Sequence, residues 1–400
     1  MKRFDKPILV TRPYLPDLDE FKAGCEEIWA NRWLTNNGPM LKRFHAELAR
    51  YLGAPETNMA LFNNGTLALE MGFKALGLFG AEVITTPFTF VATSHALKRI
   101  GAKPVFADID PETLCLSPAA AEKLIKPGIT KAIVPVHVYG NVCDIDGFER
   151  LREKYGVKII YDAAHAFGVK KSKSGVEVEQ RNSNLHCSLS SSGFVSQQSI
   201  AAEGDMSMFS FHPTKLFHSC EGGLLVFKDA ALQQKLFDLR NFAIHGELSC
   251  VDVGTNAKMN ELQALMGLCC LKKINALLDC RQKIYEAYSK IFNNPLSNSN
   301  SKLQLIPHSA NKAYVPVLFK DFETRERVYA GLKEKCNVFS RRYFYPLLTD
   351  FAPYQYAKGA CPVAEDIARR VLTLPTYYGL DLDDVRDIAK NVLEMMRDEP

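Results

Sequence analysis

The 400-residue chain lacks any apolar run of 18 or more residues, so the sequence predicts no transmembrane helix. Residues 1–21 begin with basic side chains, but no apolar stretch of the kind found in a secretory signal peptide follows them. Long runs of like charge are also missing and the net charge is only +4, which argues against nucleic acid as a partner. We therefore expect a cytoplasmic protein that binds neither membranes nor nucleic acid.

The eleven cysteines form no CxxC pair and no Cys/His cluster with the spacing of metal ligands. Reduced thiols without a bound metal are the simplest expectation for such scattered cysteines. What the chain does have is apolar content, 47% of its residues, which is enough for one large core and a second, smaller one.

From residue 59 onward, short apolar segments alternate with segments of helical periodicity. The predicted strands are 59–62, 83–86, 104–107, 132–136 and 158–161, and the predicted helices between them are 66–76, 90–100, 118–124 and 145–155. This alternation predicts an α/β fold with a mainly parallel sheet covered on both faces. In such sheets, ligands bind at the carboxyl ends of the strands.

The pattern also suggests how the chain divides. We predict a large domain over residues 1–270 and a smaller C-terminal α/β domain over residues 271–400. A segment rich in serine, glutamine and asparagine, at about 171–201, has no clear period and interrupts the large domain. A surface excursion is the expected interpretation of that segment, with a functional lid as the alternative.

One lysine stands directly after a predicted strand. The apolar run 206–211 is followed by Pro213, by Lys215 and then by Glu-Gly-Gly at 221–223. Desolvation beside a buried strand lowers the pKa of a lysine, so that part of it is a neutral amine able to form a Schiff base. An isolated lysine in this position is more often a plain surface residue, and the neighbouring motifs decide between the two.

Three further motifs lie at the ends of predicted strands. Asp162, in the string DAAHAFG, follows an apolar strand, where an aspartate otherwise serves as a helix cap or turn residue. Asn-Asn-Gly-Thr at 63–66 opens a helix, and the free N–H groups of a helix start attract anions, although such turns are also common caps. The run TPFTFVAT at 86–93 offers Phe88 as an aromatic surface, with Phe90 expected in the core.

In chain order, the motifs NNGT, DAAHAFG and SFHPTK with EGG resemble those of the DegT/DnrJ/StrS family of pyridoxal-phosphate-dependent nucleotide-sugar aminotransferases of fold type I. The resemblance implies that Lys215 is the catalytic residue and carries pyridoxal 5′-phosphate (PLP), and that Asp162 keeps the pyridine nitrogen protonated. It implies further cofactor contacts, through the phosphate, the ring face and the phenolic oxygen, for Gly65, Thr66, Ser210, Phe88 and His165.

A fourth motif, GTNAKMNE at 254–261, resembles the family segment whose asparagine reaches the phosphate of the neighbouring subunit. By that resemblance Asn256 is a cofactor contact and the protein is a homodimer with shared active sites. Lys258 stands where the family usually has arginine, which keeps the charge but loses the bidentate geometry.

The resemblance extends to the substrates. The strings WLTNNG, VITTPFTFVATSHAL and RRYFYP look most like the subgroup that uses L-glutamate to aminate C4 of a dTDP- or UDP-linked 4-keto-6-deoxyglucose. Arg341 and Tyr343 are then candidates for contacts to the nucleotide sugar. Amination at C3, a GDP-linked acceptor and a non-catalytic scaffold protein with this fold are the alternatives. The last predicts loss of Lys215 or Asp162, and the chain has both.

Overall fold

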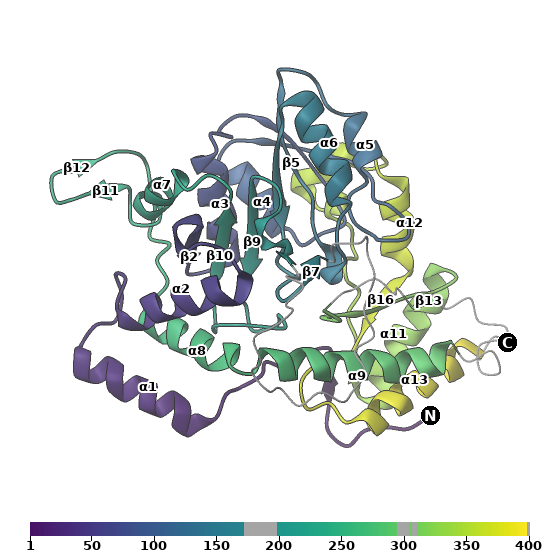
Figure 1. The fold of residues 1–400 in the computed structure, drawn as a ribbon. Helices are drawn as coiled ribbons and strands as arrows, with labels where there is room; N and C mark the ends of the chain where they lie inside the picture. The colour runs from purple at the N-terminus through teal and green to yellow at the C-terminus, as the bar shows by residue number, and fades with distance from the viewer. Residues whose placement is uncertain (172–197, 294–303, 306–310, 398–400) are drawn as a thin grey trace, which may run out of the picture.

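A seven-stranded sheet forms the centre of the computed structural model, which describes residues 1–171, 198–293, 304–305 and 311–397 (Figure 1). The sheet order is β2-β10-β9-β6-β5-β3-β4. These strands are β2 (Met59–Phe62), β3 (Glu82–Thr85), β4 (Lys103–Phe106), β5 (Thr130–Val134), β6 (Lys158–Asp162), β9 (Met206–Ser210) and β10 (Gly223–Phe227). Within this sheet only β10 runs antiparallel to its neighbours, which confirms the predicted mainly parallel α/β fold.

Both faces of the sheet are covered. In β10, Leu224 and Val226 belong to one hydrophobic cluster, whereas Leu225 and Phe227 belong to the cluster on the other face. Because successive side chains of a strand point to opposite faces, a strand buried on both sides needs a continuous apolar run. This is the pattern from which the strands were predicted.

The helices of the first 271 residues flank the sheet, except α1, which packs against α8 away from it (Figure 1). They are α1 (Leu18–Asn31), α2 (Pro39–Leu52), α3 (Gly65–Ala75), α4 (Ala92–Arg99), α5 (Pro118–Glu122), α6 (Ile145–Tyr155), α7 (Leu232–Leu239) and α8 (Glu261–Leu271). Residues of α3, α4 and α7 contribute to one cluster, and residues of α2, α6 and α8 contribute to the other. Every helix in the described part of the chain is too short or too polar to cross a bilayer.

The C-terminal part is built on a second, three-stranded sheet of β13 (Gln304–Leu305), β14 (Val315–Leu318) and β16 (Val371–Leu374). Its helices are α9 (Ile274–Phe292), α11 (Phe322–Cys336), α12 (Pro362–Arg370) and α13 (Leu382–Arg397). The sequence predicts one helix over 363–372. The C-terminal end of this prediction is wrong, because Val371 and Leu372 belong to β16 and pair with β14. A short apolar run does not by itself distinguish a buried strand from a helix.

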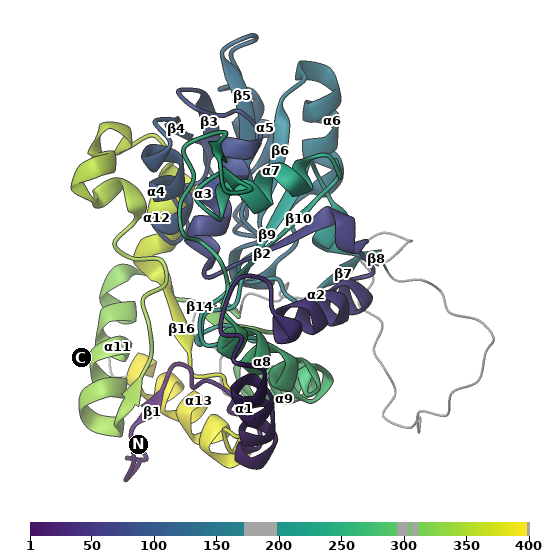
Figure 2. The ribbon, with the colours of Figure 1, turned by 90° about the vertical axis from the view of Figure 1, so that its left-hand side faces the viewer.

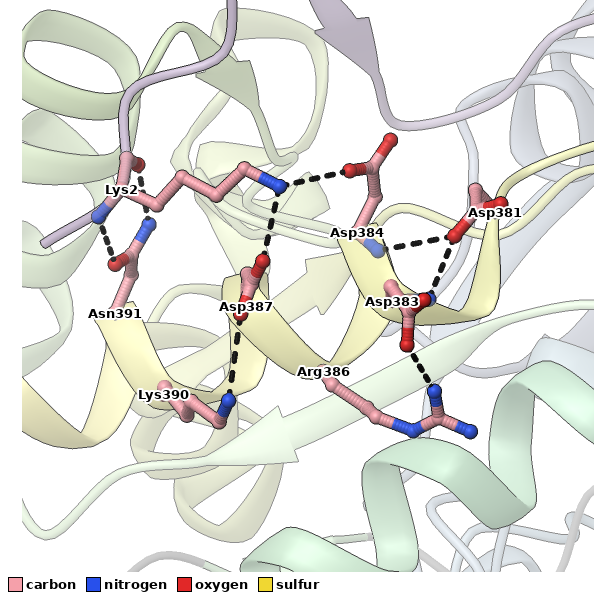
Figure 3. Close-up of polar contacts among 8 residues, drawn as sticks. All are labelled: Lys2, Asp381, Asp383, Asp384, Arg386, Asp387, Lys390 and Asn391. Carbon is pink, nitrogen blue, oxygen red and sulfur yellow. Dashed lines mark hydrogen bonds and ion pairs between the residues drawn. The ribbon is translucent and has the colours of Figure 1, made fainter.

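The N-terminus lies against the C-terminal part of the chain. Strand β1 (Ile8–Leu9) pairs with β15 (Val338–Phe339), and the backbone of Lys2 exchanges two 2.8 Å hydrogen bonds with the side chain of Asn391 (Figure 3). The Lys2 ammonium forms ion pairs with Asp384 and Asp387 at 3.2 and 2.9 Å. We propose that residues 1–9 belong to the smaller domain, whose boundary at 270 is otherwise a prediction.

Part of the C-terminal chain returns to the large core. Helix α12 lies beside the large sheet (Figure 2), and its first N–H groups, those of Val363 and Ala364, each donate to the Asp108 carboxylate at 2.9 Å. Most of the predicted excursion at 171–201 lies outside the described residues. The residues at its two ends pair as the antiparallel strands β7 (Lys170–Lys171) and β8 (Gln198–Ser199), so these ends lie side by side.

Candidate active site

Asp162 is the last residue of β6, in the middle of the large sheet, and its exposed fraction is 4%. One carboxylate oxygen accepts a hydrogen bond from Thr93 Oγ1 at 2.6 Å, and the other accepts one from the Ala164 N–H at 3.1 Å. Burial raises the pKa of Asp162, whereas the two hydrogen bonds and the positive charge of Lys215 act against that rise. The carboxylate is therefore buried with dedicated donors at the edge where ligands bind in such sheets.

Lys215 lies in the turn between β9 and β10, and its backbone N–H donates to His212 O at 2.9 Å. Strand β9 runs parallel to β6, so the segment after β9 that carries Lys215 lies at the same edge of the sheet as Asp162 and His165. The charge of Lys215 acts on the pKa values of both residues. Within the described part of the chain, the Lys215 amine has neither a hydrogen-bond nor an ion-pair partner. An amine beside a buried carboxylate and without a competing partner suits covalent chemistry.

His165 follows Asp162 by three residues and is also buried. Its Nδ1 accepts a hydrogen bond from the Tyr139 N–H at 3.1 Å, so the ring proton is on Nε2. Burial, reinforced by the charge of Lys215, lowers its pKa well below the ordinary value. The ring lies parallel to that of Phe344, with centroids 6.0 Å apart. His165 is thus a neutral, fixed imidazole with one N–H to donate.

The turn before α3 has the features of an anion cradle. The Asn64 side chain caps the helix by accepting from the Leu67 N–H at 2.9 Å, while the N–H groups of Gly65 and Thr66 have no acceptor within the helix. A Cβ on Gly65 would lie 3.1 Å from the Cβ of Ser210, and a Cβ on Gly223 would lie 2.4 Å from Asn64 O. Glycine at these positions lets the turn pack directly against β9 and β10, which brings Gly65, Thr66 and Ser210 together.

The two phenylalanines of the 86–93 segment have opposite environments. Phe88 is buried and makes edge contacts with Tyr139 and Phe344 at centroid distances of 6.1 and 5.6 Å. Phe90, expected in the core, is 49% exposed, so that expectation is wrong. The chain turns between β3 and α4 here, and the residues of a turn do not share one inward face. Stacking of Phe88 on a cofactor stays a prediction.

Arg341 and Tyr343 lie close to Lys215 in space. The Arg341 backbone is bridged to Thr373 of β16, and its guanidinium lies over the Tyr343 ring, 4.3 Å from the centroid. Both residues line a small pocket of about 20 Å³ that also includes Thr214, the neighbour of Lys215. A cavity of that size holds about one water molecule. Contacts of Arg341 and Tyr343 with a nucleotide sugar stay a prediction.

Asn256 is exposed, and no hydrogen bond in the described structure joins it to Asp162 or Lys215. It lies at the base of a hairpin formed by β11 (Ile244–His245) and β12 (Ser249–Cys250), which projects from the body (Figure 1). Lys258 donates to Asn241 Oδ1 at 2.6 Å and lies over the Phe242 ring. The lysine that replaces the family's arginine therefore holds the base of this hairpin.

Sequence reasoning did not single out Thr93, Tyr139 or Asn311. Thr93 bonds the Asp162 carboxylate, the Tyr139 N–H fixes the His165 tautomer, and Asn311 donates to His165 O at 2.8 Å. Of the three, Thr93 could most easily have been predicted from the sequence. It lies at the start of helix α4, which follows strand β3, and the carboxyl end of β3 lies on the same edge of the sheet as Asp162. Asn311 lies far away in sequence, and nothing near it marks such a contact.

A known protein family matches almost the whole chain. Residues 17–393 match the model of the DegT/DnrJ/EryC1/StrS aminotransferase family. The chain belongs to this family. It is 38% identical to dTDP-4-amino-4,6-dideoxy-D-glucose transaminase of Shigella dysenteriae, over 98% of this chain and 100% of that protein. The enzyme of the same name from Escherichia coli is 36% identical, with the same two shares.

Among solved structures, DesI in the presence of its TDP-sugar product superposes with a TM-score of 0.85 at 31% identity, covering 99% of this chain and 95% of that one. The family resemblance and the fold predicted from sequence, fold type I of the PLP-dependent transferases, are thereby confirmed. Membership of the family implies a PLP cofactor.

Proposed function

We propose that the protein transfers the amino group of L-glutamate to C4 of a dTDP-linked 4-keto-6-deoxyglucose, giving dTDP-4-amino-4,6-dideoxyglucose. The observation that carries the proposal is that Lys215, Asp162 and His165 lie at the carboxyl ends of the parallel neighbours β9 and β6, beside the glycine turn that opens α3. Two full-length relatives named for this sugar nucleotide support the choice of substrate.

The residues present fit PLP. The close packing of Gly65 over Ser210 leaves a shallow turn of N–H groups for a phosphate. The buried Asp162 carboxylate suits a protonated pyridine nitrogen, and the His165 N–H suits a phenolic oxygen. When bound, PLP supplies the carbonyl that takes up the amino group and the ring that withdraws electrons from the reacting carbon.

The protein's own residues then have separate tasks. Lys215 would hold the cofactor, and its Nζ, when it is a free amine, would carry a proton at the reacting carbon as a general acid and base. Asp162 holds the proton on the ring nitrogen through its negative charge. Tyr139 and Phe344 keep the His165 ring in place through the backbone hydrogen bond and the parallel ring contact.

We further propose that the working protein is a homodimer. The hairpin exposes Leu248, Val251 and Val253, with Leu248 99% exposed at its tip. A groove of about 840 Å³ between α1 and α8 is lined by apolar side chains that include Phe21, Trp29 and Leu262. Exposed apolar surface of this kind is typical of an association site. A second copy that covers it would also bring a partner's hairpin, with its Asn256, toward the phosphate turn.

The test is the reaction itself. The PLP-loaded protein, L-glutamate and dTDP-4-keto-6-deoxyglucose should yield the amino sugar nucleotide by mass spectrometry, with nitrogen on C4 by NMR. The UDP- and GDP-linked sugars and a 3-keto sugar are run in parallel. A clear preference for one of those acceptors would overturn the assigned substrate, and loss of transfer with every acceptor would favour the scaffold alternative. The Lys215→Ala protein is the negative control.

A further inference from the structure

Thr93 donates a short side-chain hydrogen bond to Asp162 of the candidate site. Its Oγ1 lies 2.6 Å from Asp162 Oδ2, and both side chains are buried. The two residues are 69 positions apart, so helix α4 and strand β6 must pack in one arrangement for the bond to form. A bond of this length between a hydroxyl and a carboxylate is of the charge-assisted kind, which is stronger than a neutral hydrogen bond.

The direction of this bond is fixed by its surroundings. An ionised carboxylate accepts hydrogen bonds but cannot donate one, so Thr93 must be the donor. The hydroxyl of Thr89, also buried, lies 3.4 Å from Thr93 Oγ1 and can donate to it in turn. Both threonines follow Phe88 in the 86–93 segment, so one short segment supplies the candidate ring surface and the support of the carboxylate.

The two oxygens of Asp162 have one donor each. Thr93 holds Oδ2 and the Ala164 N–H holds Oδ1, which fixes the rotation of the carboxylate about its side chain. Loss of the Thr93 donor would free that rotation and leave Oδ2 buried without its partner, which favours the neutral, protonated acid. The same bond opposes the rise that burial causes in the Asp162 pKa.

We propose that Thr93 is a positioning residue that keeps the Asp162 carboxylate charged and aimed at the pyridine nitrogen of the cofactor. The inference rests on the proposed function only in that Asp162 faces the ring nitrogen of PLP. Thr93 itself acts through Asp162, and its effect is on cofactor binding as much as on turnover.

The first experiment measures PLP binding to the apo-protein by equilibrium dialysis. Thr93→Val keeps the shape of the side chain and removes the hydroxyl, and it should weaken PLP binding by roughly 10-fold to 100-fold. Thr93→Ser keeps the hydroxyl and should restore most of the affinity. An unchanged affinity in Thr93→Val, or a loss in Thr93→Ser as large as in Thr93→Val, would overturn the proposal.

The second experiment replaces the cofactor atom that Asp162 faces. In the deaza analogue of PLP, a C–H takes the place of the pyridine nitrogen, so the charge of Asp162 no longer helps binding. The affinity for this analogue should be nearly equal in the original protein and in Thr93→Val. If Thr93→Val loses as much affinity for the analogue as for PLP, Thr93 has only a packing role and the proposal fails.

Thr85 provides the matched control. It is a buried threonine of the same sheet, and its hydroxyl donates to the Val134 backbone carbonyl at 2.9 Å instead of to a carboxylate. Thr85→Val should lower thermal stability without changing PLP affinity, and an equal loss of affinity there would contradict a specific role for Thr93. The binding experiments use no sugar nucleotide, so a wrong acceptor assignment would not affect them.

Discussion

The Asp162 edge of the sheet and the β11–β12 hairpin each carry part of the predicted site, and they differ in how much one chain provides. Asp162 and His165 are buried, and each has hydrogen-bond donors from residues distant in sequence. The hairpin instead exposes Leu248, Val251 and Val253, and Asn256 at its base is exposed as well. One chain thus supplies the hydrogen-bond partners of Asp162 and His165, whereas the apolar surface of the hairpin is where we propose that a second copy binds.

The largest expected effect comes from the centre of the buried edge. Lys215→Ala removes both the covalent attachment point and the proton-transferring amine, so transfer should fall by more than about 10³-fold. The PLP-loaded protein should also lose the visible absorption band that L-glutamate shifts to the near ultraviolet. Retention of that band and of its response to glutamate would show that another lysine does this work.

Asp162→Asn keeps the size of the side chain and removes its charge. The loss of a charge-assisted contact should lower kcat/KM by about 100-fold, with weaker PLP binding. Asp205→Asn is the control, because this aspartate lies directly before β9 and accepts from the Ile159 N–H at 2.9 Å, outside the candidate site. Asp205→Asn should reduce stability but not PLP affinity, and similar kinetic losses in both variants would contradict a special role for Asp162.

The role of the hairpin is tested by mixing two variants, each altered at one residue of the proposed shared site. Asn256→Asp places a negative charge where a phosphate is expected and should weaken PLP binding about 10-fold. After refolding or subunit exchange with Lys215→Ala, hybrid dimers contain one site with both residues intact. With random mixing, and at a PLP concentration too low to load the Asn256→Asp sites, activity should return to about a quarter of the original. Activity no higher than the sum of the separate variants would contradict a shared site.

The smallest predicted effect concerns pH. Burial lowers the pKa of His137 to about 3 and that of His165 well below its ordinary value. Their contribution to stability is complete above about pH 6.5 and is lost as the pH falls toward the folded-state pKa, because only the unfolded chain takes up the proton. The slope for one such histidine is about 1.4 kcal/mol per pH unit.

Urea unfolding of the apo-protein at pH 7, 6 and 5 measures this dependence. His137→Asn should flatten the loss of stability between pH 6 and 5, whereas His245→Asn, on the exposed hairpin, should leave the slope unchanged. Equal slopes for the original protein and His137→Asn would show that the buried histidine is not the cause.

The two regions also differ in what could be predicted from the sequence. Strands β2 to β6 were found within a residue or two because burial on both faces demands continuous apolar runs, and Asp162 and Lys215 stand out at the ends of such runs. The partners of the site residues were not found, because the Thr93–Asp162 and Tyr139–His165 contacts arise only when separate elements pack. The predicted burial of Phe90 and the predicted helical end at 371–372, which is the start of β16, were wrong for the same reason. The local pattern does not show which side of a turn is buried or whether a segment pairs with another strand.

The most direct test of the central claim is to locate the cofactor on the chain. Borohydride reduction of the PLP-loaded protein fixes a lysine-bound cofactor as a stable amine, and peptide mass spectrometry then identifies the modified residue. The structure predicts modification of Lys215, and its disappearance when L-glutamate is added before the borohydride. Modification of a different lysine, or of none in protein that contains bound PLP, would contradict the assignment of this sheet edge as the active site.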